Sequence, residues 1–382
     1  YLNQINAPNA WGVSTGSSNI TVAVVDNAID RAHTDLSGNV WTNPGEIAGD
    51  GLDNDGNGYI DDVNGYDVAD DDNNTIPTNN AMSHGTHCSG TAAGRTNNST
   101  GVASISWNVK LIPVKCQTDG GSTTGIANGY GGILYAAKVK ARVISCSWGG
   151  PGTANASEQA VINYAWSKGC IIICATGNSN TNALHYPAAY NNVYSVVSIS
   201  SSDVKSSFSN YGTWADICAP GENIRSTITA NAYTYMNGTS MATPCVAGLA
   251  ALMLSKAPYM TQTDVLNCIS TTAVNIYPVN SGTLAGQLGA GRIDAYQAML
   301  CAAGFSAQPV VSNFYSLINK TCPGTPISIT DSSLYLPTAW SWTFQAGTPP
   351  TSTSSNPAVS WASPGTYSIA LQATNANGGN VK

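Results

Sequence analysis

The chain has 382 residues, only 9% of them charged, and a formal net charge of −7 at pH 7. This length allows one large domain, or a large domain with a small companion. The negative charge argues against a nucleic acid or an anionic membrane as partner, because both attract Lys and Arg. No apolar run is long enough to cross a bilayer, so membrane insertion is not expected.

Ten cysteines, none of them in a CxxC pair, favour disulfides in an oxidising compartment over a zinc site. The alternative is a set of buried free thiols, and it applies most readily to Cys88. The opening residues Tyr1-Leu-Asn-Gln lack the basic and apolar regions of a signal peptide, so we expect a processed or truncated terminus. Together these features favour a secreted, extracellular protein.

Short apolar runs alternate with helix-like segments from Ile20 to about Leu300. Runs rich in β-branched residues predict buried strands at residues 21–25, 110–114, 142–146, 170–174 and 193–197. Helices are predicted between them, for example at residues 125–140 and 156–168. This alternation predicts an α/β domain with a mainly parallel sheet and helices on both faces. In such sheets, functional residues gather at the carboxyl ends of the strands.

The composition changes near Ser306. Beyond Gln308 there is no helical period, only short alternating stretches separated by Pro, Gly and Ser, which predicts a small all-β sandwich. We place the boundary at residues 304–309, which gives a domain of residues 1–304 and a second of residues 309–382.

Candidate catalytic residues lie in three separate short motifs of the sequence. Asp26 follows the predicted strand 21–25, Gly85 directly follows His84, and Ser240 precedes an apolar helix-like stretch. Each has a simpler explanation by itself: a turn residue, a structural histidine and a helix N-cap. A helix N-terminus also offers free N–H groups and a positive dipole end to a developing oxyanion.

Taken together, these motifs resemble those of the subtilisin-like serine proteases, or subtilases. The resemblance covers roughly residues 1–304. The matching motifs are Val24-Val-Asp-Asn-Ala-Ile-Asp, His84-Gly-Thr-His-Cys-Ser-Gly and Gly238-Thr-Ser-Met-Ala-Thr-Pro. Their order along the chain, Asp then His then Ser, is that of the family.

The resemblance implies a secreted serine endopeptidase that cleaves peptide bonds through an acyl-enzyme intermediate. It assigns Ser240 as nucleophile, His84 as base and Asp26 as the residue that orients the base. Asn178, whose alternative is a turn residue, would be the side-chain oxyanion donor beside the backbone N–H of Ser240. The family also implies an N-terminal propeptide before maturation, and we expect a monomer.

The sequence departs from the family after the catalytic aspartate. There the family usually has Ser or Thr and then Gly, whereas this chain has Asn27 and Ala28. Ala28 would resist a backbone angle that only Gly tolerates. This departure is the reason for one alternative, a catalytically inactive subtilase-like binding protein. The acidic loops and the predicted sandwich are the reason for a second, a calcium-dependent adhesion or matrix protein. We expect an active enzyme, because the three catalytic groups are present.

The resemblance also indicates where protein and peptide substrates would bind. Ser147, Trp148, Gly149 and Gly150 would pair with the substrate backbone as an added strand. The pocket for the side chain before the scissile bond would lie between this segment and the residues Ala175, Thr176 and Gly177. His185 would lie near its floor, with a structural role beside the Tyr-Pro turn as the alternative. His33 is predicted at the surface.

Acidic loops point to structural Ca²⁺. One acidic segment has oxygen-bearing side chains at alternate positions, as at the start of an EF-hand loop. Its candidate ligands are Asp53, Asp55, Asn57 and Asp62. Asn64 stands where an EF-hand has a bidentate Glu. The alternative is a solvated turn. Thermitase-like subtilases imply a second loop of Asp67, Asp70 and Asp72, and a third site of Asp35 with Asn98. Such ions would stabilise loops flanking the active site.

Residues 309–382 resemble a PKD domain, an Ig-like sandwich often attached to secreted hydrolases. The matching residues are Trp340-Ser-Trp-Thr-Phe and residues 364–375. The chain is expected to stop before a final strand is complete. Binding of an insoluble substrate and a spacer role are both compatible with this fold.

Overall fold

The computed structural model describes residues 1–280, 282, 284–305, 308–335 and 337–382. The chain divides into two compact units, Tyr1–Cys301 and Ala302–Lys382. The boundary at 304–309 stays a prediction, and its residues 306 and 307 lie outside the described residues.

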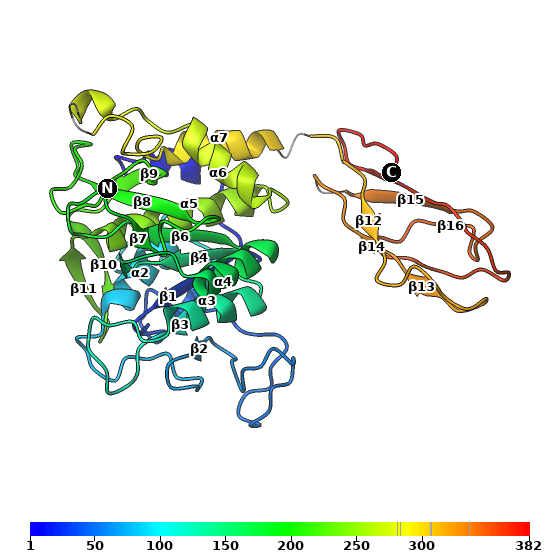
Figure 1. Ribbon diagram of the computed structural model, residues 1–382, viewed down its shortest axis with the longest axis horizontal. Helices are drawn as coiled ribbons and strands as arrows, with labels where there is room; N and C mark the ends of the chain where they lie inside the picture. The colour runs from blue at the N-terminus through cyan, green and yellow to red at the C-terminus, as the bar shows by residue number, and fades with distance from the viewer. Residues whose placement is uncertain (281, 283, 306–307, 336) are drawn as a thin grey trace. The chain divides into compact units, whose positions relative to one another are not determined.

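A seven-stranded parallel sheet forms the centre of the first unit (Figure 1). Its strands, in spatial order, are β2 (Tyr66–Asp67), β3 (Lys110–Lys115), β1 (Thr21–Asp26), β4 (Val143–Cys146), β6 (Ile171–Ala175), β8 (Tyr194–Ile199) and β9 (Ile217–Pro220). The five predicted strands are all present, so the predicted parallel sheet is confirmed. Their continuous apolar runs reflect burial on both faces.

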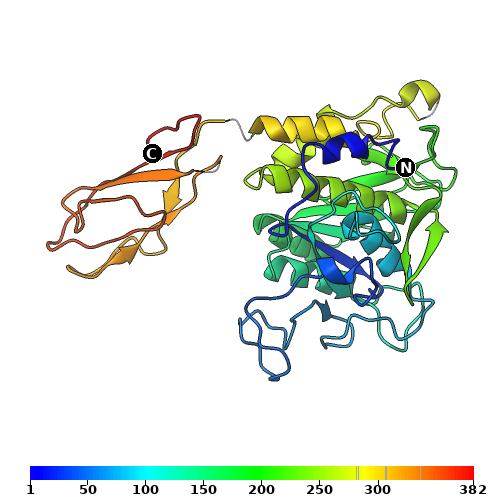
Figure 2. The same ribbon diagram turned by 180° about the vertical axis from the view of Figure 1, so that it is seen from behind.

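Helices cover both faces of this sheet, as predicted (Figure 2). On one face, α3 (Gly129–Lys138) and α4 (Ala156–Ser167) share a core with alternate strand residues such as Ile144. On the other face lie α2 (His84–Ala93) and α5 (Thr239–Lys256). The remaining helices are α1 (Ala7–Trp11), α6 (Gln262–Thr271), α7 (Ala295–Phe305) and the 3-10 turns Ser37–Asn39 and Tyr277–Val279.

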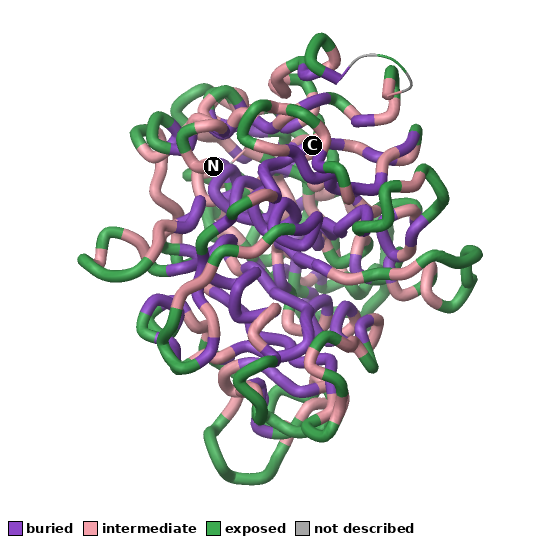
Figure 3. Tube along the Cα trace, turned by 90° about the vertical axis from the view of Figure 1, so that its left-hand side faces the viewer, coloured by how far each residue is buried: buried purple, intermediate pink, exposed green. Residues whose placement is uncertain are grey.

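The chain at the centre of the first unit is mostly buried (purple in Figure 3). Helix α5 is buried at every position from Thr239 to Leu254. A helix that is apolar around its whole circumference belongs in the interior of a large domain. Its buried position fixes its N-terminus, which carries Ser240, against the carboxyl ends of the strands.

Two small antiparallel pairs complete the first unit. β5 (Gly150–Pro151) pairs with β7 (His185–Tyr186), and β10 (Ile224–Ile228) pairs with β11 (Ala232–Met236). The first pair joins two segments that the resemblance assigns to the substrate pocket.

Beyond helix α7, the described residues of the second unit form only β-strands and loops, as predicted. β15 (Ala339–Phe344) lies between β16 (Thr351–Ser352) and β18 (Ile369–Thr374), and two further antiparallel pairs are β12 (Phe314–Tyr315) with β14 (Thr330–Asp331) and β13 (Ile327–Ser328) with β17 (Ala358–Val359). Trp342 and Phe344 stack in its core, with ring centroids 6.0 Å apart.

The structure corrects one expectation and refines another. His33 is buried and not at the surface, because its Nε2 lies 3.2 Å from the Ala232 carbonyl and its Nδ1 accepts the Asp35 N–H. Cys268 and Cys301 form a disulfide, whereas seven of the other cysteines are buried free thiols and Cys322 is an exposed one. No helix in the described part of the chain is long and apolar enough to span a membrane.

Candidate active site

Asp26 and His84 meet where strand β1 ends and helix α2 begins. The Nδ1 atom of His84 lies 2.7 Å from Oδ1 of Asp26, and the same oxygen accepts the Asn27 N–H at 2.7 Å. Gly85 permits this contact, because a Cβ there would lie 2.8 Å from the Asp26 Cβ and 2.5 Å from the Ala28 carbonyl oxygen. The glycine after the histidine thus lets the helix approach the strand end.

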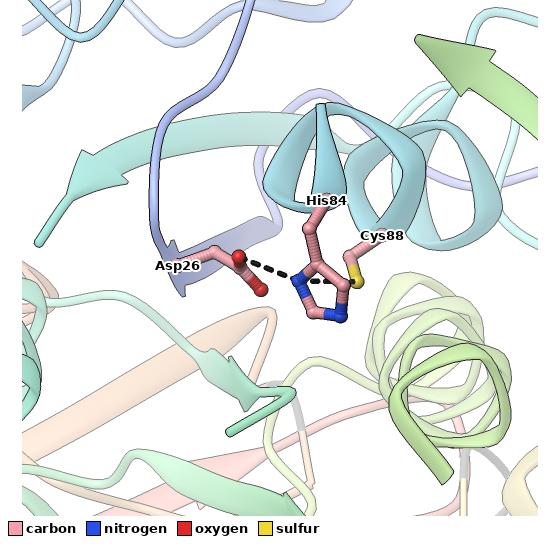
Figure 4. A group of neighbouring side chains, drawn as sticks. All are labelled: Asp26, His84 and Cys88. Carbon is pink, nitrogen blue, oxygen red and sulfur yellow. Dashed lines mark hydrogen bonds and ion pairs between the residues drawn. The ribbon is translucent and has the colours of Figure 1, made fainter. Parts of the chain in front are cut away.

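The electrostatics of the His84 ring are set by its neighbours (Figure 4). Burial is the largest single influence and would lower the pKa of His84, but the charge and hydrogen bond of Asp26, together with Cys88, outweigh it and raise the pKa well above its ordinary value. On the other side of the ring, Cys88 Sγ lies 4.0 Å from Nδ1, and burial raises the pKa of this thiol. Cys88 is therefore a buried neutral thiol. This agrees with the alternative prediction that some cysteines are buried free thiols and not disulfides.

Ser240 is the second residue of helix α5. Its Oγ donates to the Ser147 carbonyl at 2.9 Å, and the Ser147 Oγ donates back to the Ser240 carbonyl at 2.9 Å. No hydrogen bond joins Ser240 to His84 among the described residues, although both line the same cleft. The Ser240 N–H belongs to the first turn, whose N–H groups lack helical partners.

Asn178 reaches the same helix terminus. Its Oδ1 accepts the Thr239 N–H at 2.9 Å and the Thr239 hydroxyl at 3.0 Å, which orients the amide. A Cβ on Gly238 would lie 3.5 Å from the Ser240 nitrogen and 3.6 Å from Asn178 Nδ2. Two hydrogen-bond donors therefore flank one small space beside the serine.

The departure at Asn27 and Ala28 leaves this arrangement intact. Ala28 is absent from the described residues with positive φ, so the position does not require glycine. Asn27 Oδ1 accepts the N–H groups of Ala28 and Gly85, and its Nδ2 donates to the Thr123 carbonyl. Asn27 thus braces the turn between strand β1 and helix α2.

A cleft of about 790 Å³ contains the candidate triad. Its walls include the predicted substrate segments, represented by Ser147, Trp148, Gly149, Gly150, Ala175, Gly177 and His185, whereas Thr176 is buried behind them. The His185 Nε2 would lie 3.0 Å from a Cβ on Gly149 and 2.8 Å from one on Gly177. The two glycines therefore make room for the imidazole, and burial lowers the pKa of His185.

Residues 17–293 match the Subtilase family, and residues 323–381 match the PKD domain. The chain belongs to the subtilase family. It is 40% identical over 290 residues to the thermophilic serine proteinase of Bacillus sp. (strain AK1), covering 76% of this chain and 64% of that protein. It is 38% identical over 298 residues to thermitase of Thermoactinomyces vulgaris, covering 78% and 94%.

The fold comparison agrees. A solved protease structure from Pseudoalteromonas arctica superposes with a TM-score of 0.64 at 29% identity, covering 78% of this chain and 94% of that chain. Family membership and the serine proteinase relatives make this subtilase a serine endopeptidase.

The first acidic loop of this subtilase brings three carboxylates together. Ligand atoms of Glu46, Asp55 and Asp62 lie within 4.8 Å of one another. Glu46 Oε2 is buried without a hydrogen-bond partner among the described residues, and burial raises the pKa of Asp62 to about 6. An unpaired buried carboxylate oxygen beside two more acidic groups fits a cation such as Ca²⁺.

The other residues predicted for this loop lie around that cluster. Asn57 Nδ2 donates to Asp55 and Asp62, and Asp53 accepts the N–H groups of Asn57 and Gly58. Sequence reasoning missed Glu46, which precedes the loop and was outside the EF-hand spacing.

The second acidic loop surrounds an ammonium group. Lys115 is fully buried, and its Nζ contacts Asp67 Oδ2 at 2.6 Å, Asp70 Oδ2 at 3.6 Å and the Asp119 carboxylate. Asp72 instead accepts the Asn74 N–H. Ligand atoms of Asp67, Asp70 and Asp119 also lie within 4.8 Å of one another. Lys115 already supplies a cation among these carboxylates, and a Ca²⁺ at this loop stays a prediction.

The third predicted pair lies together but is already hydrogen-bonded. Asp35 Oδ1 accepts the Asn98 amide at 2.7 Å, and Asp35 Oδ2 accepts the Val102 N–H at 2.8 Å. Both carboxylate oxygens of Asp35 therefore have protein donors.

Proposed function

We propose that Ser240 is the nucleophile of this subtilase and that it forms an acyl-enzyme intermediate. The observation that supports this most directly is the 2.7 Å contact between His84 and Asp26 at the wall of the cleft that also contains Ser240. Ser240 Oγ would turn from the Ser147 carbonyl toward His84, give its proton to the imidazole and attack the peptide carbonyl.

Asp26 would stabilise the imidazolium, which then gives its proton to the leaving amine. The negative carbonyl oxygen would take hydrogen bonds from Asn178 Nδ2 and the Ser240 N–H. Water would then attack the acyl-enzyme with His84 again acting as base. The substrate backbone would lie along Ser147–Gly150, with the preceding side chain between that segment and residues 175–177, above His185.

We further propose that Ca²⁺ binds the cluster of Glu46, Asp55 and Asp62 and has a structural role. The protein would be secreted, and the Cys268–Cys301 disulfide fits an oxidising compartment. Removal of an N-terminal propeptide would precede activity, and the mature enzyme would be a monomer of peptidase residues 1–304 joined to residues 309–382.

Labelling with a fluorophosphonate tests the nucleophile. Mass spectrometry of the adduct should place one label on Ser240, with labelling lost in His84→Ala and Ser240→Ala, and casein hydrolysis lost in parallel. A folded, calcium-loaded sample that neither labels nor hydrolyses casein would show a non-catalytic protein.

A further inference from the structure

The substrate cleft contains a second carboxylate besides Asp26. Glu158 lies in the first turn of helix α4 and lines the cleft. Its Oε2 accepts the Tyr190 hydroxyl at 2.6 Å. No Lys, Arg or His forms an ion pair with it among the described residues, whereas Asp26 is paired with His84.

The walls of the cleft near Glu158 are aromatic and apolar. Ile126, Tyr130 and Trp148 all line it, and the rings of Tyr130 and Trp148 meet edge to face with centroids 5.5 Å apart. Burial first, and then a hydrogen bond to Glu158 and its negative charge, raise the pKa of Tyr130. The Tyr130 ring centroid lies 6.4 Å from that of Tyr190, whose hydroxyl donates to Glu158, so both tyrosines belong to the surroundings of the carboxylate.

Glu158 also has a structural contact at the start of its helix. The Tyr190 hydroxyl that donates to Glu158 accepts the Asn155 N–H at 2.9 Å, and Asn155 caps helix α4. A carboxylate has about four lone-pair sites, so the two tyrosine hydroxyls leave room for a further donor. The structural contact thus does not use up the acceptor capacity of Glu158.

We propose that Glu158 makes the cleft select a basic side chain, Lys or Arg, two to four residues before the scissile bond. The aliphatic part of such a side chain packs against Ile126 and the rings, while its cation meets the carboxylate and the aromatic faces. This inference rests on the proposed function, because it takes the substrate backbone to run along Ser147–Gly150.

Binding to the Ser240→Ala protein tests the cleft without catalysis. Fluorescent peptides that differ only in Lys or norleucine at each of these positions are titrated by anisotropy. At one position, the Lys peptide should bind about tenfold more tightly than the norleucine peptide. The added Glu158→Gln substitution should remove this ratio, whereas Glu222→Gln, a carboxylate outside the cleft, should preserve it.

Equal binding of Lys and norleucine peptides at every position would overturn the inference. So would a Lys preference that persists in the Glu158→Gln protein. If the Glu158→Gln protein has a lower melting temperature but keeps the Lys preference, Glu158 has a structural role only. Fluorophosphonate labelling of Ser240 in the parent protein is read separately, so failure of catalysis is distinguished from failure of this specificity.

Discussion

The Nδ1 atom of His84 lies 2.7 Å from Asp26 Oδ1. Burial would lower the pKa of His84, but the charge and hydrogen bond of Asp26, together with Cys88, outweigh burial and raise it. The proposed base must be neutral to accept the Ser240 proton. The raised pKa therefore means that the neutral, active form of His84 predominates only at higher pH. The contact that would stabilise the imidazolium in the proposed mechanism should also influence the pH dependence of the free enzyme.

The pH profile of kcat/KM should show this directly. We expect its ascending limb to have a midpoint above 6.5, the ordinary pKa of histidine, and Asp26→Asn to lower kcat by about 10⁴-fold. In that variant the Asp26 charge no longer opposes burial, so the limb should move to lower pH. The stability that the Asp26–His84 pair contributes is present below pH 6.5 and is lost as pH rises through the raised pKa. A limb that Asp26→Asn leaves in place would contradict this assignment.

Loss of the Asn178 amide should affect the transition state more than substrate binding. We expect Asn178→Ala to lower kcat by roughly 10²–10³ with little change in KM, because its Nδ2 would bind the oxyanion and not the ground-state carbonyl. Steady-state kinetics on a chromogenic peptide measure both constants. Asn182→Ala, a neighbouring exposed asparagine that does not line the cleft, is the matched control. A rise in KM with kcat unchanged would contradict the proposed role of Asn178 as an oxyanion donor.

Gly85→Ala should disturb the contact between strand β1 and helix α2. The new Cβ would lie 2.5 Å from the Ala28 carbonyl oxygen and 2.8 Å from the Asp26 Cβ, so backbone must shift. We expect a loss of about 1–3 kcal/mol in the free energy of unfolding and a large loss of activity. Gly120→Ala, where a Cβ meets nothing within 4 Å, should behave like the parent protein in denaturant titration and in peptide hydrolysis.

Calcium should stabilise the first acidic loop through Glu46, Asp55 and Asp62. At a free concentration of about 100 times Kd, the ion would add about 2.7 kcal/mol to the free energy of unfolding. Calorimetry with Ca²⁺ and with a chelator should therefore give different melting temperatures, and Glu46→Gln should reduce the difference. Glu222→Gln serves as the control. Identical melting curves with ion and chelator would exclude this site.

The Lys115 cluster should respond differently. Lys115→Met leaves the buried Asp67 without its ammonium partner, which should cost about 3–5 kcal/mol of stability in the absence of calcium. Burial would lower the pKa of Lys115, but its hydrogen bonds to Asp119 and Asp67 and the negative charges of both carboxylates together raise it, so the Lys115 ammonium should stay charged near neutrality. Ca²⁺ should restore part of the stability of the variant. If the parent protein already bound calcium at Asp67 and Asp70, the Lys115 assignment would fail.

The local features of this subtilase could be predicted from its sequence. Continuous β-branched runs identified the strands because a strand covered on both faces has no polar side. The motifs around Asp26, His84 and Ser240 each lie at the end of a strand or the start of a helix. The parallel topology brings such ends to one edge of the sheet.

Contacts between distant segments required the tertiary structure. Lys115 is 48 residues from Asp67, and only the pairing of β2 with β3 places its ammonium among the acidic side chains of a predicted calcium loop. Glu46 and Glu158 carry no local signal of their sites. Their charges acquire a role through the groups that folding places around them, because electrostatic energies depend on distance and burial and not on separation along the chain.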